Sequence, residues 1–270
     1  MIANKKIAFS DFELEYNIQG EGTPVFFIHG FGETYHVWER QINFLKNNFK
    51  LITCNLPGTQ CSDFLGEATQ SLEGFAQCIK KIVEAENIHS FVLIGHSMGG
   101  YVALSYQDLF PKDLIGLGLI HSTCFPDTDT KKENRKKAIS FLKNHGSEAF
   151  LKQAFPDLFL NKGQGLENIE QLVNNGKITH EKILCSYYEA IMQRPNRVKT
   201  IKNLSFPLLF IAGKNDTLIP LIDSLSQSYL APITFLKILE KSAHMGMLEE
   251  TEIINETLLK YLTYINQFNK

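Results

Sequence analysis

The chain has 270 residues, of which 44% are hydrophobic and 21% charged, and its formal net charge is −2. A chain of this length can bury a large core, and the composition is typical of a globular protein. The near-neutral charge excludes the basic field that attracts nucleic acids or anionic membranes, so we expect neither as a partner.

Cysteine content and hydropathy indicate the compartment. The chain has an odd number of cysteines without CxxC spacing, which favours reduced thiols over a disulfide framework or a zinc site (Cys54, Cys61, Cys78, Cys124 and Cys185). The first residues lack the apolar centre of a signal peptide, and no apolar run approaches the length of a membrane-spanning helix. We therefore expect a cytoplasmic protein without a membrane span.

The first part of the chain alternates predicted strands and helices. Residues 12–18 alternate apolar and polar side chains, which predicts a half-exposed strand, whereas 25–28 and 51–54 are continuous apolar runs typical of buried strands. Apolar residues at helical spacing predict helices over 35–47 and 72–83. This alternation predicts a parallel sheet covered by helices on both faces.

The most informative stretch is 91–104, which reads FVLIGHSMGGYVAL. Four apolar residues predict a buried strand, and the apolar run after Gly100 predicts a buried helix. Between them Gly95, Ser97 and Gly99 form the pattern Gly-x-Ser-x-Gly, in which glycines allow a turn sharp enough to expose the serine above the strand end. We interpret Ser97 as a nucleophile on such a turn.

Alternation continues with a strand at 114–120, stops, and resumes with strands at 207–213 and 233–238 before a closing helix. The intervening segment is polar and helical in character, and a structureless loop of that length would be unusual. We therefore predict a core made of residues 1–121 and 205–270, with 122–204 inserted as a helical cap. The basic run from Lys131 to Lys137 is interpreted as the solvated face of a cap helix.

A serine hydroxyl needs a base to remove its proton and an acid to orient that base. In a parallel sheet these partners are expected just after strands, and Asp216 and His244 both lie at such positions, in the chain order serine, acid, histidine. His121 also ends a strand and is the rival base; we expect it near the pocket but outside the triad. Asp127 and Asp129, at the start of the cap, are weaker candidates for the acid.

Acyl transfer also requires backbone donors for the oxyanion of the tetrahedral intermediate. We predict the N–H of Met98, directly after the nucleophile, and the N–H of Phe31, in the glycine-rich loop after the strand at 25–28. His29 and His96 adjoin glycine turns and are interpreted as structural. Nothing in the sequence implies a metal or an organic cofactor.

The sequence resembles the α/β-hydrolase superfamily, in particular its cap-bearing esterase and enol-lactonase-like branch. The matching motifs cover most of the chain: HGFG (29–32), NLPG (55–58) followed by Ser62, GHSMGG (95–100), GKNDTLIP (213–220) and SAHMGMLEE (242–250). The resemblance implies an α/β-hydrolase fold with a mostly parallel, eight-stranded sheet, helices on both faces and an inserted helical cap. Two positions depart from the family pattern, because Asn55 replaces an aspartate and Gln60 a glycine.

These observations predict a serine hydrolase that cleaves a small or medium apolar carboxylic ester through Ser97, His244 and Asp216. Most cap aromatics are expected to pack the cap onto the sheet, with one or two lining an apolar pocket (Phe125, Phe141, Phe150, Phe155 and Phe159). Lactone hydrolysis, carbon–carbon bond hydrolysis and perhydrolysis use the same residues and stay open. A ligand receptor with little turnover on a hydrolase scaffold is the alternative from another class.

Overall fold

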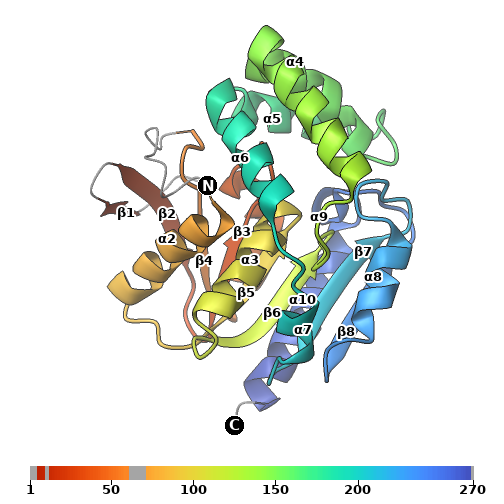
Figure 1. Cartoon of the computed structure of the whole chain (residues 1–270). Coiled ribbons are helices and arrows are strands. Elements are labelled where there is room, and N and C mark those ends of the chain that lie inside the picture. The colour runs from red at the N-terminus through yellow and green to blue at the C-terminus, as the bar shows by residue number, and fades with distance from the viewer. Residues whose placement is uncertain (1–4, 10–11, 61–70, 269–270) are drawn as a thin grey trace.

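The computed structural model describes residues 5–9, 12–60 and 71–268, and its centre is one eight-stranded sheet (Figure 1). The strands run in the order β1-β2-β4-β3-β5-β6-β7-β8. Their bounds are β1 (Lys5–Ala8), β2 (Glu13–Gln19), β3 (Pro24–Ile28), β4 (Lys50–Cys54), β5 (Phe91–His96), β6 (Leu114–Ile120), β7 (Leu208–Gly213) and β8 (Thr234–Leu239). Two antiparallel pairings, β1 with β2 and β2 with β4, begin the sheet, and all later pairings are parallel. The predicted fold class is confirmed.

The central strands are buried on both faces, as their continuous apolar runs predict. Every residue of β5 and β7 is buried, and Phe26 of β3 pairs in register with Ile52 of β4 and Leu93 of β5. Burying a large apolar side chain stabilises the fold by about 1.5–3 kcal/mol. This packing gives the loops that follow the strands a rigid base.

Helices cover both faces of the sheet. In Figure 1, α2 (Leu72–Ala85) and α3 (Met98–Leu109) lie side by side in front of it, while α10 (Thr251–Phe268) lies behind it. The helix α10 packs against α1 (Glu39–Leu45), which the short helix η1 (Tyr35–Trp38) precedes. Two further helices, α8 (Leu221–Ser228) and α9 (Gly246–Glu249), follow β7 and β8.

The segment between β6 and β7 is helical, with α4 (Asp129–Ala154), η3 (Phe155–Leu158), α5 (Leu166–Gly176), α6 (Glu181–Gln193) and α7 (Val198–Lys202). Figure 1 shows α4, α5 and α6 beyond one end of the sheet. The helix α4 is kinked at Gly146, where the residue has φ 78°. The division of the chain at residues 122 and 204 stays a prediction.

The structure bears on the cysteines, on the two departures from the family pattern and on membrane-spanning helices. Cys61 and Ser62 lie outside them, and the four cysteines within them are free and buried. Gln60 has φ 48°, a left-handed conformation that glycine adopts more easily. The Asn55 amide bonds to the Gln60 side chain, so the loop is held together despite the substitution. Within the described ranges, no helix has the length and apolar character needed to cross a bilayer.

Candidate active site

Ser97 lies between the end of β5 and the start of α3, where the sequence predicts the nucleophile turn. Its φ of 49° is in the left-handed region, which costs a non-glycine residue about 1–3 kcal/mol and persists only where the surroundings enforce it. A Cβ on Gly95 would collide with the backbone of Gly99, and a Cβ on Gly99 with the carbonyl of Ile28. The flanking glycines are therefore required for the chain to turn this closely.

Asp216 and His244 meet at the ends of two neighbouring strands. Asp216 follows β7, His244 follows β8, and the His244 Nδ1–H donates to Asp216 Oδ2 at 2.7 Å. The other carboxylate oxygen accepts the backbone N–H groups of Leu218 and Ile219, both at 2.9 Å. Burial alone would raise the pKa of Asp216, but the adjacent imidazoles hold that pKa far below its usual range. Asp216 is therefore a carboxylate, and among the residues that the structure describes none bonds to Nε2 of His244.

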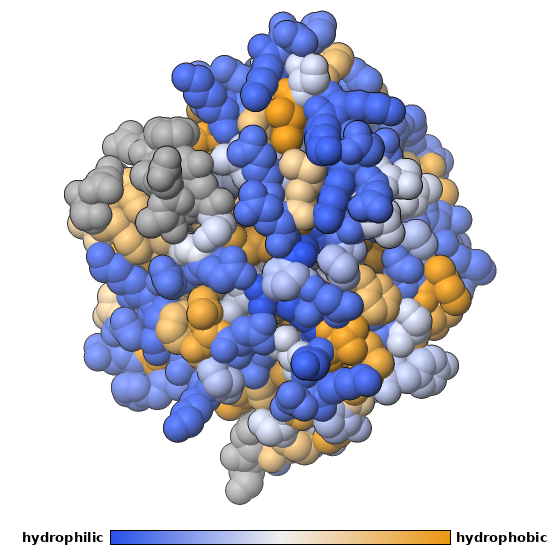
Figure 2. Space-filling model, in the orientation of Figure 1, coloured by the Kyte–Doolittle hydropathy of each residue, from blue (hydrophilic) through white to orange (hydrophobic). Residues whose placement is uncertain are grey.

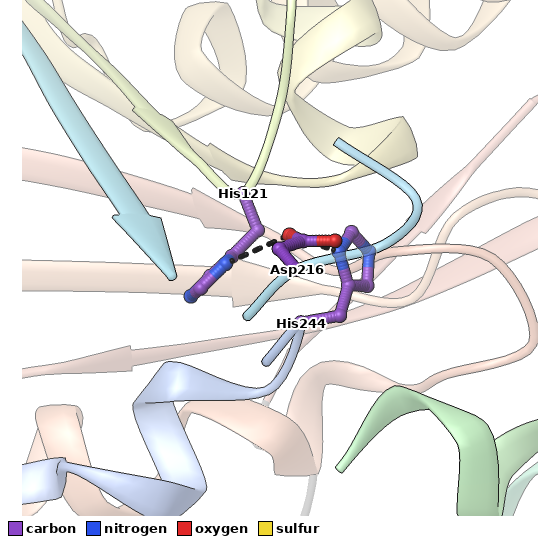
Figure 3. Close-up of side chains that lie close together, drawn as sticks. All are labelled: His121, Asp216 and His244. Carbon is purple, nitrogen blue, oxygen red and sulfur yellow. Dashed lines mark hydrogen bonds and ion pairs between the residues drawn. The ribbon is translucent and has the colours of Figure 1, made fainter. Parts of the chain in front are cut away.

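His121 is a second imidazole on the same carboxylate oxygen, and it flanks Asp216 on the side away from His244 (Figure 3). Its Nε2 accepts the N–H of Gly246 at 3.2 Å, so Nδ1 carries the proton and donates to Asp216 at 3.1 Å. Burial lowers the pKa of His121 to about 4, which makes this ring neutral at pH 7. The sequence places it near the pocket; the structure puts it in direct contact with the acid.

The cluster of His121, Asp216 and His244 also has ligand atoms close enough for a metal ion. A histidine nitrogen binds a metal only in its unprotonated state. Because Gly246 donates to Nε2 of His121, the nitrogen that faces Asp216 is a protonated donor. We therefore interpret the cluster as a hydrogen-bonded network.

His96 and Glu33 form a buried pair that hydrogen-bonds to the backbone of His244. His96 donates from Nδ1 to Glu33, whose Oε1 lies at 2.9 Å, and from Nε2 to the carbonyl of His244 at 3.0 Å. Burial alone would lower the pKa of His96, but the Glu33 carboxylate raises it, and the pKa of Glu33 is lowered in turn. His29 is different: burial lowers its pKa, and it accepts a backbone N–H from the loop after β4. Both histidines have the structural contacts predicted for them, whereas no sequence pattern pointed to Glu33.

Ser97 and His244 line one cavity of about 460 Å³, together with Phe31 and Met98. Within the described residues, Ser97 Oγ has no hydrogen bond, and so none to His244. Such catalytic bonds are often long without substrate. The same cavity therefore contains the predicted nucleophile, the predicted base and both residues predicted to donate to the oxyanion.

The segment between β6 and β7 also lines the cavity, through Phe150, Phe155, Leu158 and Tyr188. The ring of Tyr188 stacks on Phe31 with centroids 4.0 Å apart, and the backbone N–H of His244 donates to the carbonyl of Leu158 at 2.9 Å. The remaining cap aromatics named from the sequence do not line the cavity and are buried or partly buried in the core (Phe125, Phe141 and Phe159).

The two alternative acids are engaged or remote. Asp127 is buried between Arg135 and Arg194, at 2.5 Å and 2.8 Å. Asp129 is exposed at the first turn of α4. Asp216 is the carboxylate that contacts His244.

Comparison with known proteins agrees with this fold. Residues 23–144 match the family model described as alpha/beta hydrolase fold. A thermophilic esterase from Thermogutta terrifontis superposes with a TM-score of 0.88 at 22% identity, covering 97% of this chain and 99% of its own. The fold is that of an α/β hydrolase.

Two curated relatives extend the match along the chain. The putative carbamate hydrolase RutD of Acinetobacter baylyi is 26% identical over 249 residues, which are 88% of this chain and 92% of the relative. The pimeloyl-[acyl-carrier protein] methyl ester esterase of Wigglesworthia glossinidia brevipalpis is 27% identical over 76% of this chain and 80% of its own. These matches support the α/β-hydrolase superfamily for this chain, and its class is that of a hydrolase.

Proposed function

We propose that the protein is a serine hydrolase that cleaves a carboxylic ester in the cavity containing Ser97 and His244. The observation that carries this proposal is that a serine in a strained turn and a histidine bonded to a buried carboxylate line the same cavity. A serine acyl-enzyme path uses this combination of nucleophile, base and orienting acid.

In the proposed mechanism Ser97 attacks the ester carbonyl while His244 Nε2 takes its proton. Asp216 holds the imidazole through Nδ1 and stabilises the imidazolium that forms. The N–H groups of Met98 and Phe31 hold the oxyanion. His244 then returns the proton to the leaving alcohol, and in the second step it activates the water that releases the acid. These steps use side chains, backbone and water alone.

The leaving group is the open part of the proposal. The name of one relative specifies a carbamate and that of another a methyl ester, and both carbonyls suit the same nucleophile. Carbamate hydrolysis is therefore the second candidate function. Lactones enter the same acyl-enzyme path, because their ring oxygen is the leaving group.

A fluorophosphonate probe tests the nucleophile directly, since it labels activated serines covalently. We expect labelling of the wild type and none of Ser97→Ala, with Ser90→Ala, at an exposed serine directly before β5, as the matched control. Turnover of p-nitrophenyl esters of graded acyl length then separates an enzyme from a receptor. Equal labelling of Ser97→Ala, or no turnover of any ester, carbamate or lactone, contradicts the proposal.

A further inference from the structure

The basic run from Lys131 to Lys137 is not solely a solvated face, which corrects the interpretation of it from the sequence. Lys136 and Lys137 are exposed, but Lys131 and Arg135 line the cavity that contains Ser97. Residues four apart share one face of a helix, so α4 presents two positive side chains to this cavity. Figure 2 shows that the surface over α4 is mainly hydrophilic.

The cations around this end of the cavity outnumber their acidic partners. Arg135 donates to both oxygens of Asp127, and Arg194 donates to the same carboxylate at 2.8 Å. Asp127 is fully buried, and the Arg194 and Arg135 side chains are 3% and 21% exposed. Two guanidinium groups thus share one carboxylate, and one positive charge stays uncompensated. Leaving such a charge partly out of water is costly unless a partner arrives.

Lys131 adds a further positive charge without a direct ion pair. Its Nζ donates to the carbonyl of Leu218 at 3.0 Å. Among the described residues, Asp223 and Asp127 act on it electrostatically, but neither carboxylate lies within the 4.0 Å of an ion pair. Two acidic side chains also line the cavity, but each is paired already: Glu33 with His96, and Asp157 with Lys162. Neither neutralises Lys131 or Arg135.

Arg135 is placed to bind an anion. Asp127 fixes its Nε and Nη2, and the aromatic ring of Tyr188 lies 5.4 Å from its guanidinium carbon. Its Nη1 has no hydrogen-bond partner among the described residues. A guanidinium edge fits the two oxygens of a carboxylate. The other cap residues in this wall are mainly apolar, so the positive charge is confined to one part of the cavity.

We propose that Arg135 and Lys131 form a subsite for a free carboxylate of the substrate. The preferred substrates are then esters with an anionic end remote from the scissile bond, such as hemiesters of short dicarboxylic acids. The cavity volume of about 460 Å³ is within the range of small-molecule sites. This inference rests on the proposed hydrolase function and specifies its substrate class.

The test compares monoethyl and diethyl esters of succinate, glutarate and adipate, with kcat/KM measured by acid release. The wild type is expected to prefer at least one hemiester to its diester. A hydrogen bond to a charged group is worth enough for Arg135→Gln to lower kcat/KM on that hemiester about ten- to hundredfold. The diester is expected to change less than about twofold, because it places no charge in the subsite.

Matched variants separate the subsite from general charge and from folding. Lys136→Gln makes the same change of charge on the exposed side of α4 and is expected to alter neither substrate. Lys131→Gln is expected to lower hemiester turnover selectively. Arg135→Lys is expected to keep more hemiester turnover than Arg135→Gln, because it keeps the positive charge. If Arg135→Gln unfolds, these two variants decide in the same assay. Equal losses on hemiester and diester, or a wild type without hemiester preference, overturn the subsite.

The experiments distinguish a wrong carboxylate subsite from a wrong hydrolase function. A protein that labels at Ser97 and hydrolyses diesters as fast as hemiesters refutes the subsite alone. Binding of monoethyl glutarate to Ser97→Ala is measured by calorimetry, where Arg135→Gln is expected to weaken it about tenfold or more. Such Arg135-dependent binding, together with a wild type that neither labels nor hydrolyses any ester, supports the subsite and overturns the hydrolase.

Discussion

Replacing His121 with phenylalanine removes two hydrogen bonds behind the site and keeps a planar ring. Asp216 loses one of its two imidazole donors, and the buried N–H of Gly246 loses its acceptor. A hydrogen bond to a charged group contributes about 1.5–3 kcal/mol, and an unsatisfied buried donor costs about 1–3 kcal/mol. We therefore expect the free energy of unfolding at pH 7 to fall by about 2.5–6 kcal/mol.

Activity is expected to fall much less than stability. The pKa of Asp216 is so far below its usual range that losing one donor leaves it ionised at pH 7, still bonded to His244. We expect kcat/KM of His121→Phe to drop less than about tenfold, whereas Asp216→Asn removes the charge and is expected to cost about a thousandfold or more. Urea unfolding followed by the fluorescence of Trp38, the one tryptophan, measures stability, and ester turnover measures activity.

Two further variants make the result decisive. His89→Phe changes an exposed histidine and is expected to alter neither quantity. His121→Asn suits the left-handed backbone at this position, where φ is 46°, and keeps a donor near Asp216, so we expect an intermediate stability. If His121→Phe lost as much activity as Asp216→Asn, His121 would take part in proton transfer. An unchanged stability would refute the hydrogen bonds themselves.

Three other predictions follow from the contacts around the site. The ion pair of His96 and Glu33 contributes its full stabilisation of the fold between their unfolded pKa values of about 4.5 and 6.5. This contribution is lost as the pH rises through the raised pKa of His96 or falls through the lowered pKa of Glu33. His96→Gln should flatten the dependence of the free energy of unfolding on pH, measured by urea unfolding from about pH 4 to 9. Glu249 accepts one backbone N–H from the insertion and one from the loop before His244, so Glu249→Gln should cost about 1–3 kcal/mol and speed hydrogen exchange in that loop. Gly99→Ala puts a Cβ against the carbonyls at the end of β3, and its melting temperature should fall by about 6 °C or more; wild-type melting would contradict the turn geometry.

The fold and the main site residues could be read from the sequence because their signals are local. Each buried strand is a continuous apolar run, and the turn at Ser97 needs glycines next to it. Asp216 and His244 were found because parallel strands bring their carboxyl ends to one edge. Those arguments require no knowledge of which side chains touch.

The rest of the site depends on contacts between residues distant in the sequence. His121 meets Asp216 from 95 residues away, and His96 meets Glu33 from 63 residues away, without any spacing that signals the pairing. The sequence does not predict that the side chains of Lys131 and Arg135 line the cavity, for another reason. A helix that lies over a cavity has a buried side, and the polar pattern of α4 alone gives no indication of it.

The three histidines around Asp216 differ in charge because their partners differ, and the proposed mechanism depends on that difference. His96 is protonated because Glu33 is a carboxylate unshared with another ring, so their charges cancel. His121 is neutral because burial outweighs a carboxylate that His244 shares. Asp216 therefore keeps an uncompensated negative charge to meet the imidazolium that forms on His244. A proton on His121 would cancel that charge, so the burial that lowers the pKa of His121 to about 4 keeps the Asp216 carboxylate available to the proposed base.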